Sequence, residues 1–231
     1  MGRAQKLKQQ RKEEQFELEK EKKRAFYRKI LIAALTILAI GVTVFLIILV
    51  NSLKKEEAAK PKVESAKQMI LETTKGQIVV DLFTSDTPLT VDHITNLAEQ
   101  GFYDNLRWYR VEDFVVQTGS HTQSLLAESG EAEPDQAALD QAMQEDQGVG
   151  TVLDEVGQPN VRGSIAMAKP SDPQTQKPMA NSARTDFYIL KTDASWLDSD
   201  YTVFGRVVKG MDVVDSLETT DYLLSVKIKD K

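Results

Sequence analysis

Residues 30–50, ILIAALTILAIGVTVFLIILV, form an uninterrupted run without a charged side chain. A helix of this length rises about 1.5 Å per residue and spans the roughly 30 Å hydrocarbon layer of a bilayer. The alternative is a cleaved signal peptide, whose apolar core is normally about 7–15 residues long. Here a long segment precedes the run, and EEAAK after it is a weak cleavage site. The sequence therefore predicts a single uncleaved transmembrane helix.

Positive charge flanks this apolar run on both sides. Within 15 residues, six Lys/Arg precede it and four lysines follow it. Since orientation follows the Lys/Arg bias, the sequence predicts a cytoplasmic N-terminus and an extracytoplasmic C-terminal domain. The chain is thus expected at the cell membrane as a single-pass protein that meets the lipid bilayer through residues 30–50. Its acid-containing N-terminus is closer to a bacterial anchor than to an organelle transit peptide.

The rest of the chain divides by composition. Residues 1–29 hold 11 Lys/Arg and 5 Asp/Glu, and they form either a solvated helix or a basic stripe on anionic lipid. Residues 51–68 read as a charged linker, and residues 69–231 as the folded domain. That domain carries 13 Lys/Arg and 27 Asp/Glu. Nucleic acid is therefore excluded as a partner, because neutralising phosphates requires a basic face.

Short apolar runs separated by turn residues dominate the folded domain. The expected strands are MILETT, QIVVDLF, LRWYRV, FVVQTG, GSIAMA, DFYIL, TVFGRVV and LLSVKI. Two helices are expected, one over TPLTVDHITNLAEQG with Thr87 as N-cap and Pro88 in its first position, and one over GMDVVDSLE. This pattern predicts a mainly β fold, a closed antiparallel β-barrel capped by two helices and preceded by the single transmembrane helix.

An acidic excursion around residues 120–160 interrupts the strand pattern. No Lys or Arg occurs between Arg110 and Arg162, whereas residues 111–161 contain 11 acids. The segment EPDQAALDQAMQE has apolar residues at helical spacing, so one helix is possible there. The acids do not follow the ligand spacing of an EF-hand. A solvated loop and a partner-binding segment are the two readings.

Most catalytic constellations are missing from the sequence. There is no cysteine, and the two histidines, His93 and His121, are not at metal-ligand spacing. No nucleophile elbow, P-loop or G-x-G-x-x-G motif occurs. Covalent catalysis, a metal site and a nucleotide cofactor are therefore not expected.

One polar residue inside an apolar run remains to be explained. Arg110 lies in WYRVEDFVVQTG, residues 108–119, between aromatic and β-branched side chains. A buried guanidinium is costly unless its donors are used. Arg110 is therefore either paired with a structural partner such as Glu112 or Asp113, or held in a cleft for a ligand.

Six motifs carry a family resemblance in the right order. They are TTKGQIVVDLF, TVDHITNLAEQGFYDN, WYRVEDFVVQTG, VRGSIAMA, NSARTDFYI and WLDSDYTVFGRVVKGMDVVDSLE. Through them residues 70–229 resemble the cyclophilin-type peptidyl-prolyl cis-trans isomerases, here in a membrane-anchored bacterial form. The resemblance implies an enzyme that turns the X–Pro amide without a cofactor or metal, acting on proline-containing polypeptides.

The resemblance also implies a role for each matching position. Arg110 would contact the prolyl amide, Phe114 would wall the proline pocket, and Gln117 would orient the backbone. The substrate-binding positions implied by the family are Val115, Ala168, Asp186, Tyr188, Trp196, Leu197 and Tyr201. Taken singly, the apolar members of this set are equally compatible with core positions.

Four positions depart from the family pattern. The segment between Arg110 and Phe114 is one residue shorter than in many members, which predicts a rotated phenylalanine. Asp186 stands where glutamine is common, and it is expected either to pair with Arg110 or to compete with substrate for it. Lys169 and Tyr201 stand where many members have asparagine and histidine.

Three functions are compatible with these observations. The first is a prolyl isomerase that assists the folding of exported proteins at the membrane. The second is a catalytically weak cyclophilin-like module that binds peptides or acts as a scaffold. The third places function in residues 3–28 as a cytoplasmic docking element. An Arg110 free of Asp186 in an open groove would favour the first function over the second.

Overall fold

The computed structural model describes residue 45, residues 66–130 and residues 132–231. Within these residues, no helix has both the length and the apolar character needed to cross a bilayer. The predicted basic segment, the transmembrane run apart from Phe45, and the linker up to residue 65 lie outside the described residues. Those expectations therefore remain predictions.

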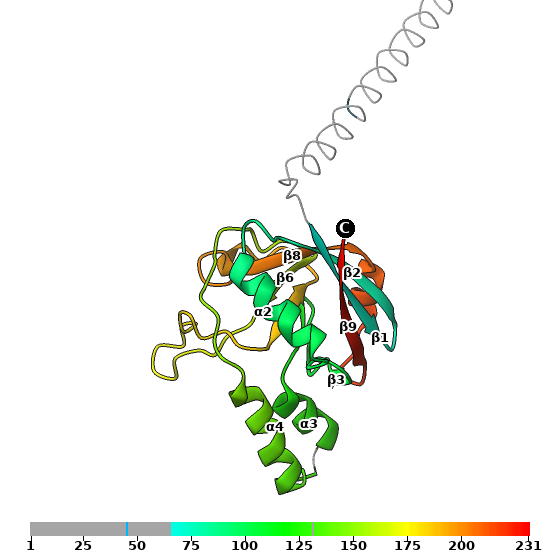
Figure 1. Cartoon of the computed structure of the whole chain (residues 1–231), viewed down its shortest axis with the longest axis vertical. Coiled ribbons are helices and arrows are strands. Elements are labelled where there is room, and N and C mark those ends of the chain that lie inside the picture. Colours follow the sequence, from blue (N-terminus) through cyan, green and yellow to red (C-terminus); the bar gives the residue numbers. More distant parts are fainter. Residues whose placement is uncertain (1–44, 46–65, 131) are drawn as a thin grey trace, which may run out of the picture. The chain divides into compact units, whose positions relative to one another are not determined.

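Nine strands form one antiparallel sheet, and all eight expected strand segments contribute to it. The strands are β1 (Lys67–Thr73), β2 (Gly76–Leu82), β3 (Leu106–Arg107), β4 (Arg110–Val111), β5 (Val115–Thr118), β6 (Ser164–Met167), β7 (Phe187–Leu190), β8 (Val203–Lys209) and β9 (Tyr222–Asp230). Their spatial order is β3-β9-β1-β2-β8-β6-β7-β5-β4. The strands that come from the six sequence motifs thus pair into a single curled sheet (Figure 1).

The prediction of a closed barrel was wrong in one respect. The strands at the two ends of the order, β3 and β4, do not pair with each other within the described part of the chain. Each has only two residues, and the expected strand LRWYRV is broken between them at Trp108 and Tyr109. The Trp108 side chain is fully buried. The sheet is therefore a half-barrel, and its two end strands are connected through Trp108 and Tyr109 instead of being hydrogen-bonded to each other.

The helices also differ from the expectation of two. Both expected helices are present, as α2 (Pro88–Glu99) and α5 (Met211–Ser216), with a short 3₁₀ turn η1 (Ser195–Leu197). The acidic excursion adds α3 (His121–Ser129) and α4 (Gln136–Gly148). These two helices contact each other and project together from the end of the domain (Figure 1). The prediction of at most one helix here was wrong.

The N-terminus of α3 is capped by a residue from α4. The Asp146 carboxylate accepts hydrogen bonds from the Ser120 hydroxyl at 2.7 Å and from the amides of His121 and Thr122 at 2.8 and 2.9 Å. A carboxylate at a helix N-terminus satisfies free N–H groups and the helix dipole. The local N-cap is Ser120, whose hydroxyl oxygen accepts from the Gln123 amide at 3.0 Å. The additional cap by Asp146 comes from more than twenty residues away, so the local sequence does not show it.

A similar long-range cap starts α2. Thr87 occupies the N-cap position, but its hydroxyl donates to the Phe83 carbonyl rather than capping the helix. Glu155, in the loop after α4, accepts instead from the amides of Leu89 and Thr90 at 3.1 and 2.8 Å. The excursion is thereby attached to the domain at both of its ends.

Strand alternation gives the sheet two different faces. On β7, Phe187 and Ile189 belong to the main core, whereas Tyr188 and Leu190 belong to a second apolar cluster. This follows from the period of two along a strand, which sends neighbouring side chains to opposite faces. The inner face builds the core, so the outer face of the same strands is free to form a site.

Candidate active site

Register places two of the three predicted catalytic residues, Arg110 and Gln117, in one row across the outer face. Arg110 on β4 lies opposite Gln117 on β5, Gln117 lies opposite Tyr188 on β7, and Tyr188 lies opposite Ala166 on β6. Directly opposite residues of antiparallel strands point to the same face. The sheet itself therefore aligns a guanidinium, an amide and an aromatic ring.

A cavity of about 350 Å³ opens over this row. Its lining contains nine of the ten predicted site residues together with Lys169 and Ser171: Arg110, Phe114, Val115, Gln117, Ala168, Tyr188, Trp196, Leu197 and Tyr201. The exception is Asp186. Apolar walls with a few polar groups at one side are the usual composition of a small-ligand or peptide site.

Arg110 stands at the edge of this cavity with its donors partly engaged. Its Nε donates to Glu112 at 2.7 Å and one terminal nitrogen donates to the Gln117 carbonyl oxygen at 3.1 Å. The expected partner Glu112 is thus confirmed, and Arg110 lowers the pKa of that carboxyl through the hydrogen bond. The side chain remains 43% exposed. An exposed ion pair of this kind is weak, so the guanidinium can turn its remaining donors to a ligand.

Aromatic side chains wall the cavity on two sides. The Phe114 ring lies 6.1 Å from the ring of the exposed Trp196, and the Arg110 guanidinium is 5.7 Å from the centre of the Phe114 ring. The Tyr188 and Tyr201 rings meet edge to face at 5.8 Å. The short segment after Arg110 therefore leaves Phe114 beside the guanidinium, despite the rotation expected from its length.

Lys169 is held away from the substrate side of the cavity. Its ammonium pairs with Asp154 at 2.7 Å, and the lysine side chain is only 3% exposed. The same ammonium lies 5.7 Å from the centre of the Tyr201 ring. The two departures from the family pattern thus contact each other, and Tyr201 keeps an aromatic wall where many members have histidine.

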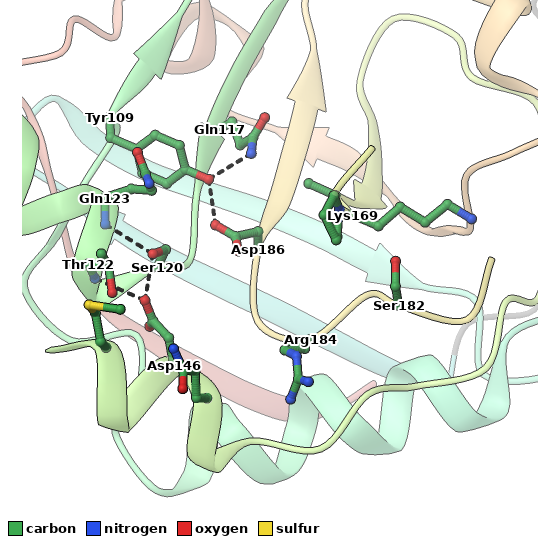
Figure 2. A pocket seen from close by; sticks show the side chains of 14 residues that line it. Tyr109, Gln117, Ser120, Thr122, Gln123, Asp146, Lys169, Ser182, Arg184 and Asp186 are labelled. Atoms are coloured by element: carbon green, nitrogen blue, oxygen red, sulfur yellow. Dashed lines mark hydrogen bonds between the residues drawn. The ribbon is translucent and has the colours of Figure 1, made fainter. Parts of the chain in front are cut away.

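Asp186 lines a neighbouring cavity of about 520 Å³, which shares Gln117, Ala168 and Lys169 with the first. Here the Tyr109 hydroxyl donates to Asp186, and the Gln117 amide nitrogen donates to the Tyr109 oxygen at 2.6 Å (Figure 2). The expectation that Asp186 pairs with Arg110 was wrong. The reason is that the Asp186 carboxylate accepts its hydrogen bond from the Tyr109 hydroxyl.

The sequence reasoning missed Tyr109 as part of the site. Its neighbour Arg110 was singled out because a cation in an apolar run is unusual, whereas a tyrosine there is not. The helical wall of the second cavity was missed as well, since Ser120, Asp146 and their neighbours belong to the excursion. The available signal was a carboxylate at position 186, directly before the apolar run Phe187–Leu190, which favours a polar partner on a facing strand.

Burial raises the pKa of Asp186 from its ordinary value of 3.8 to about 6, and the Asp146 charge adds to this against the Tyr109 hydrogen bond. The native state thus binds a proton more tightly than the unfolded chain. Stability should fall as pH rises from about 4 to 6. We expect Asp186→Asn to be more stable than the parent by about 2 kcal/mol at pH 7.5 and equal to it at pH 3.5. Urea unfolding at both pH values measures this.

The control for that prediction is Asp113→Asn, which removes an exposed carboxyl. It should change the free energy of unfolding by less than about 0.5 kcal/mol at either pH. An Asp186→Asn variant that is less stable than the parent at pH 7.5 would contradict the raised pKa.

The fold and the site together define a protein of the cyclophilin class, a curled antiparallel half-barrel with an arginine over an apolar outer cavity. The sequence profile of the cyclophilin type peptidyl-prolyl cis-trans isomerase family matches residues 68–230. The chain belongs to this family.

Individual relatives agree with this assignment. The isomerase CYP71 of Arabidopsis thaliana is 31% identical over 153 residues, covering 66% of this chain and 21% of its own length. An isomerase of Acinetobacter baylyi is 28% identical, covering 64% of this chain and 69% of its own length. The chain spans between 21% and 66% of the first three curated relatives.

Solved structures share the fold. A cyclophilin type isomerase of Cryptosporidium parvum, crystallised in the presence of the dipeptide Ala-Pro, is 19% identical with a TM-score of 0.53. The match covers 71% of this chain and 99% of that one. At this identity the likeness shows the fold, and the residues of the site must be argued from their own geometry.

Proposed function

We propose that this chain catalyses cis–trans isomerisation of X–Pro peptide bonds at the cavity under Arg110. One observation carries the proposal, the convergence on a single cavity of nine residues to which the family resemblance assigns a role. They come from three strands (β4, β5 and β7), the β4–β5 turn, the position after β6, and η1 with the segment that follows it. Core residues chosen at random would not gather on the outer face of the sheet.

The chemistry follows from the amide itself. Resonance opposes rotation by about 18–20 kcal/mol, and uncatalysed exchange takes tens to hundreds of seconds. In the twisted transition state the prolyl nitrogen becomes pyramidal and gains a lone pair. A donor aimed at that nitrogen stabilises the transition state more than the planar ground state, which is the requirement for catalysis.

The residues of the cavity fit these steps. Arg110 supplies N–H donors at the rim, and Phe114 with Val115 offers a dry wall for the pyrrolidine ring. Gln117 is placed to meet the substrate backbone beside Arg110. No proton transfer or covalent intermediate is required, because rotation breaks no σ bond.

We further propose that the reaction takes place at a bacterial cell membrane on exported polypeptides. The support is the uncharged run at residues 30–50 and the excess of Lys/Arg before it. A proline-containing substrate is supported by the dipeptide used with the Cryptosporidium parvum relative. Partner binding by the acidic excursion stays a prediction.

Trp196 gives a direct test of this proposal. It is 65% exposed beside the cavity, whereas Trp108 is fully buried. Addition of an Ala-Pro peptide to the full-length chain should change tryptophan emission saturably, and the same peptide should exchange faster by NMR. An Ala-Ala peptide should do neither. The emission change should vanish in Trp196→Phe. Saturable binding with an unaltered exchange rate would replace the enzyme by a peptide-binding module.

A further inference from the structure

Four side chains form a continuous chain of hydrogen bonds behind the cavity. Arg110 donates to the Gln117 carbonyl oxygen at 3.1 Å, and the Gln117 amide nitrogen donates to the Tyr109 hydroxyl oxygen at 2.6 Å. The Tyr109 hydroxyl in turn donates to Asp186. Figure 2 shows Tyr109 between Gln117 and the carboxylate, with its oxygen pointing at both.

The Asp186 carboxylate determines the donor–acceptor direction of all the hydrogen bonds in this series. An ionised carboxylate only accepts hydrogen bonds, so the Tyr109 hydroxyl must donate to Asp186. Its oxygen then accepts from the NH₂ group of Gln117, which turns the amide carbonyl toward Arg110. In the opposite orientation the NH₂ group would face the guanidinium, and neither group can accept from the other.

Arg110 has an alternative partner outside the cavity. Glu112 already accepts from its Nε at 2.7 Å. Without the Gln117 carbonyl, the cavity-side contact described above that remains for the guanidinium is with the Phe114 ring, at 5.7 Å, and no hydrogen bond there would oppose the pull of that carboxylate. Gln117 therefore decides whether the arginine stays over the prolyl site.

We propose that Tyr109 and Asp186 are positioning residues that hold Gln117, and through it Arg110, in the orientation needed for isomerisation. Neither Tyr109 nor Asp186 lines the proline cavity, so both act through another residue. This inference rests on the proposed isomerase function. It also assigns a role to the aspartate that stands where the family commonly has glutamine.

The backbone conformation at Gly119 allows the segment that carries Asp186 to lie close to the strand that carries Gln117. Gly119, at the end of β5, has φ +114, and a Cβ there would lie 2.5 Å from the Thr185 carbonyl oxygen and 2.7 Å from the Asp186 Cα. Only glycine permits this approach at such a φ. The segment carrying Asp186 thus packs directly against the strand that carries Gln117.

The charged groups around Asp186 leave its protonation responsive to pH. From α4, Asp146 faces it and disfavours a second negative charge. Lys169 is occupied by Asp154, and Arg184 donates to the Val149 carbonyl. Both cations point away from the carboxylate in Figure 2. The buried Tyr103 hydroxyl binds the Thr185 carbonyl instead.

Protonation would release the directional constraint. A neutral carboxyl group can donate or accept, so either orientation of Tyr109 and Gln117 becomes possible. Since the pKa of Asp186 is about 6, the oriented state should form as pH rises through that value. Turnover is therefore expected to increase between about pH 5 and pH 7.5, with substrate affinity little changed.

The test uses the full-length chain and its Tyr109→Phe and Asp186→Asn variants, with kcat and KM for an Ala-Pro peptide measured from pH 5 to 8. Tyr109→Phe should lower kcat about tenfold at pH 7.5 and leave KM within about twofold. Asp186→Asn, whose amide resembles the neutral acid, should give a flat pH profile at the low-pH level of the parent. Tyr103→Phe removes another buried tyrosine hydroxyl and should match the parent.

The outcomes separate this inference from the proposed function. A parent chain without isomerase activity overturns the function itself. An active parent with Tyr109→Phe equal to Tyr103→Phe in kcat overturns the positioning role alone. Should Tyr109→Phe fail to fold, Asp186→Asn decides, and a parent-like rise of its kcat through pH 6 overturns the inference.

Discussion

Arg110→Ala is expected to lower kcat for X–Pro exchange by about 10²–10³-fold, the usual cost of removing one donor aimed at a developing charge. The substitution removes the N–H groups over the cavity but leaves the apolar walls of Phe114 and Trp196. Peptide binding should therefore weaken far less than turnover. NMR exchange rates measure kcat, and Trp196 emission measures occupancy in the same sample.

The control for this variant is Arg162→Ala. Arg162 is also an exposed arginine in an ion pair, with Asp215 at 2.6 Å, but it lies outside both cavities. Its exchange rate should equal that of the parent. An Arg110→Ala variant that retains more than a third of parental kcat would remove the arginine from the mechanism.

Phe187→Ala is expected to reduce the free energy of unfolding by about 3–5 kcal/mol, the range for deleting a buried aromatic side chain. Phe187 is fully buried, and its ring meets those of Tyr103, Trp108 and Phe204 at 5.3, 6.4 and 6.5 Å. The residues on either side of it in sequence, Asp186 and Tyr188, each line one of the two cavities. Loss of the Phe187 ring should thus make the site as well as the core less rigid.

Urea unfolding of parent and variant measures the stability change. The matched control is Phe114→Ala, which removes the same ring from a half-buried position on the outer side. It should cost less than about 1.5 kcal/mol yet abolish most turnover. Equal destabilisation by the two variants would contradict the division of the sheet into a core face and a site face.

Much of this division was readable from the sequence. The strand from Phe187 to Leu190 alternates by two, and the neighbouring strand of Val115, Val116 and Gln117 does the same. The family resemblance assigns Gln117 and Tyr188 to the site, and the β5–β7 register in the structure places them opposite each other on one face. The cavity under Arg110 therefore contains the residues expected of it.

What the sequence did not reveal depends on pairs far apart in the chain. Asp186 meets Tyr109 across 77 residues, and Glu155 caps a helix 65 residues earlier. Glu155 lies in the excursion, for which a solvated loop was one expectation, and Asp186 begins an expected strand, so neither local pattern identifies the distant partner. The start of α3 is likewise held in part by Asp146 from α4, although its local N-cap Ser120 was a signal in the sequence.

The two charged residues that depart from the family pattern, Asp186 and Lys169, each have a partner within the chain. Asp186 accepts a hydrogen bond from Tyr109, and Lys169 forms an ion pair with Asp154. Neither charge therefore reaches the Arg110 guanidinium. Among the residues that the structure describes, Arg110 is then the cation of this cavity that is free to meet a substrate, as the enzymatic hypothesis requires.

The most direct measurement of the central claim is the cis–trans exchange rate of an Ala-Pro peptide at saturating occupancy, compared between the full-length chain and Arg110→Ala. We expect strong acceleration by the parent and a rate lower by about 10²–10³-fold with the variant, while Trp196 emission reports a filled cavity in both. Equal exchange rates for parent and variant, with both folded and occupied, would contradict it.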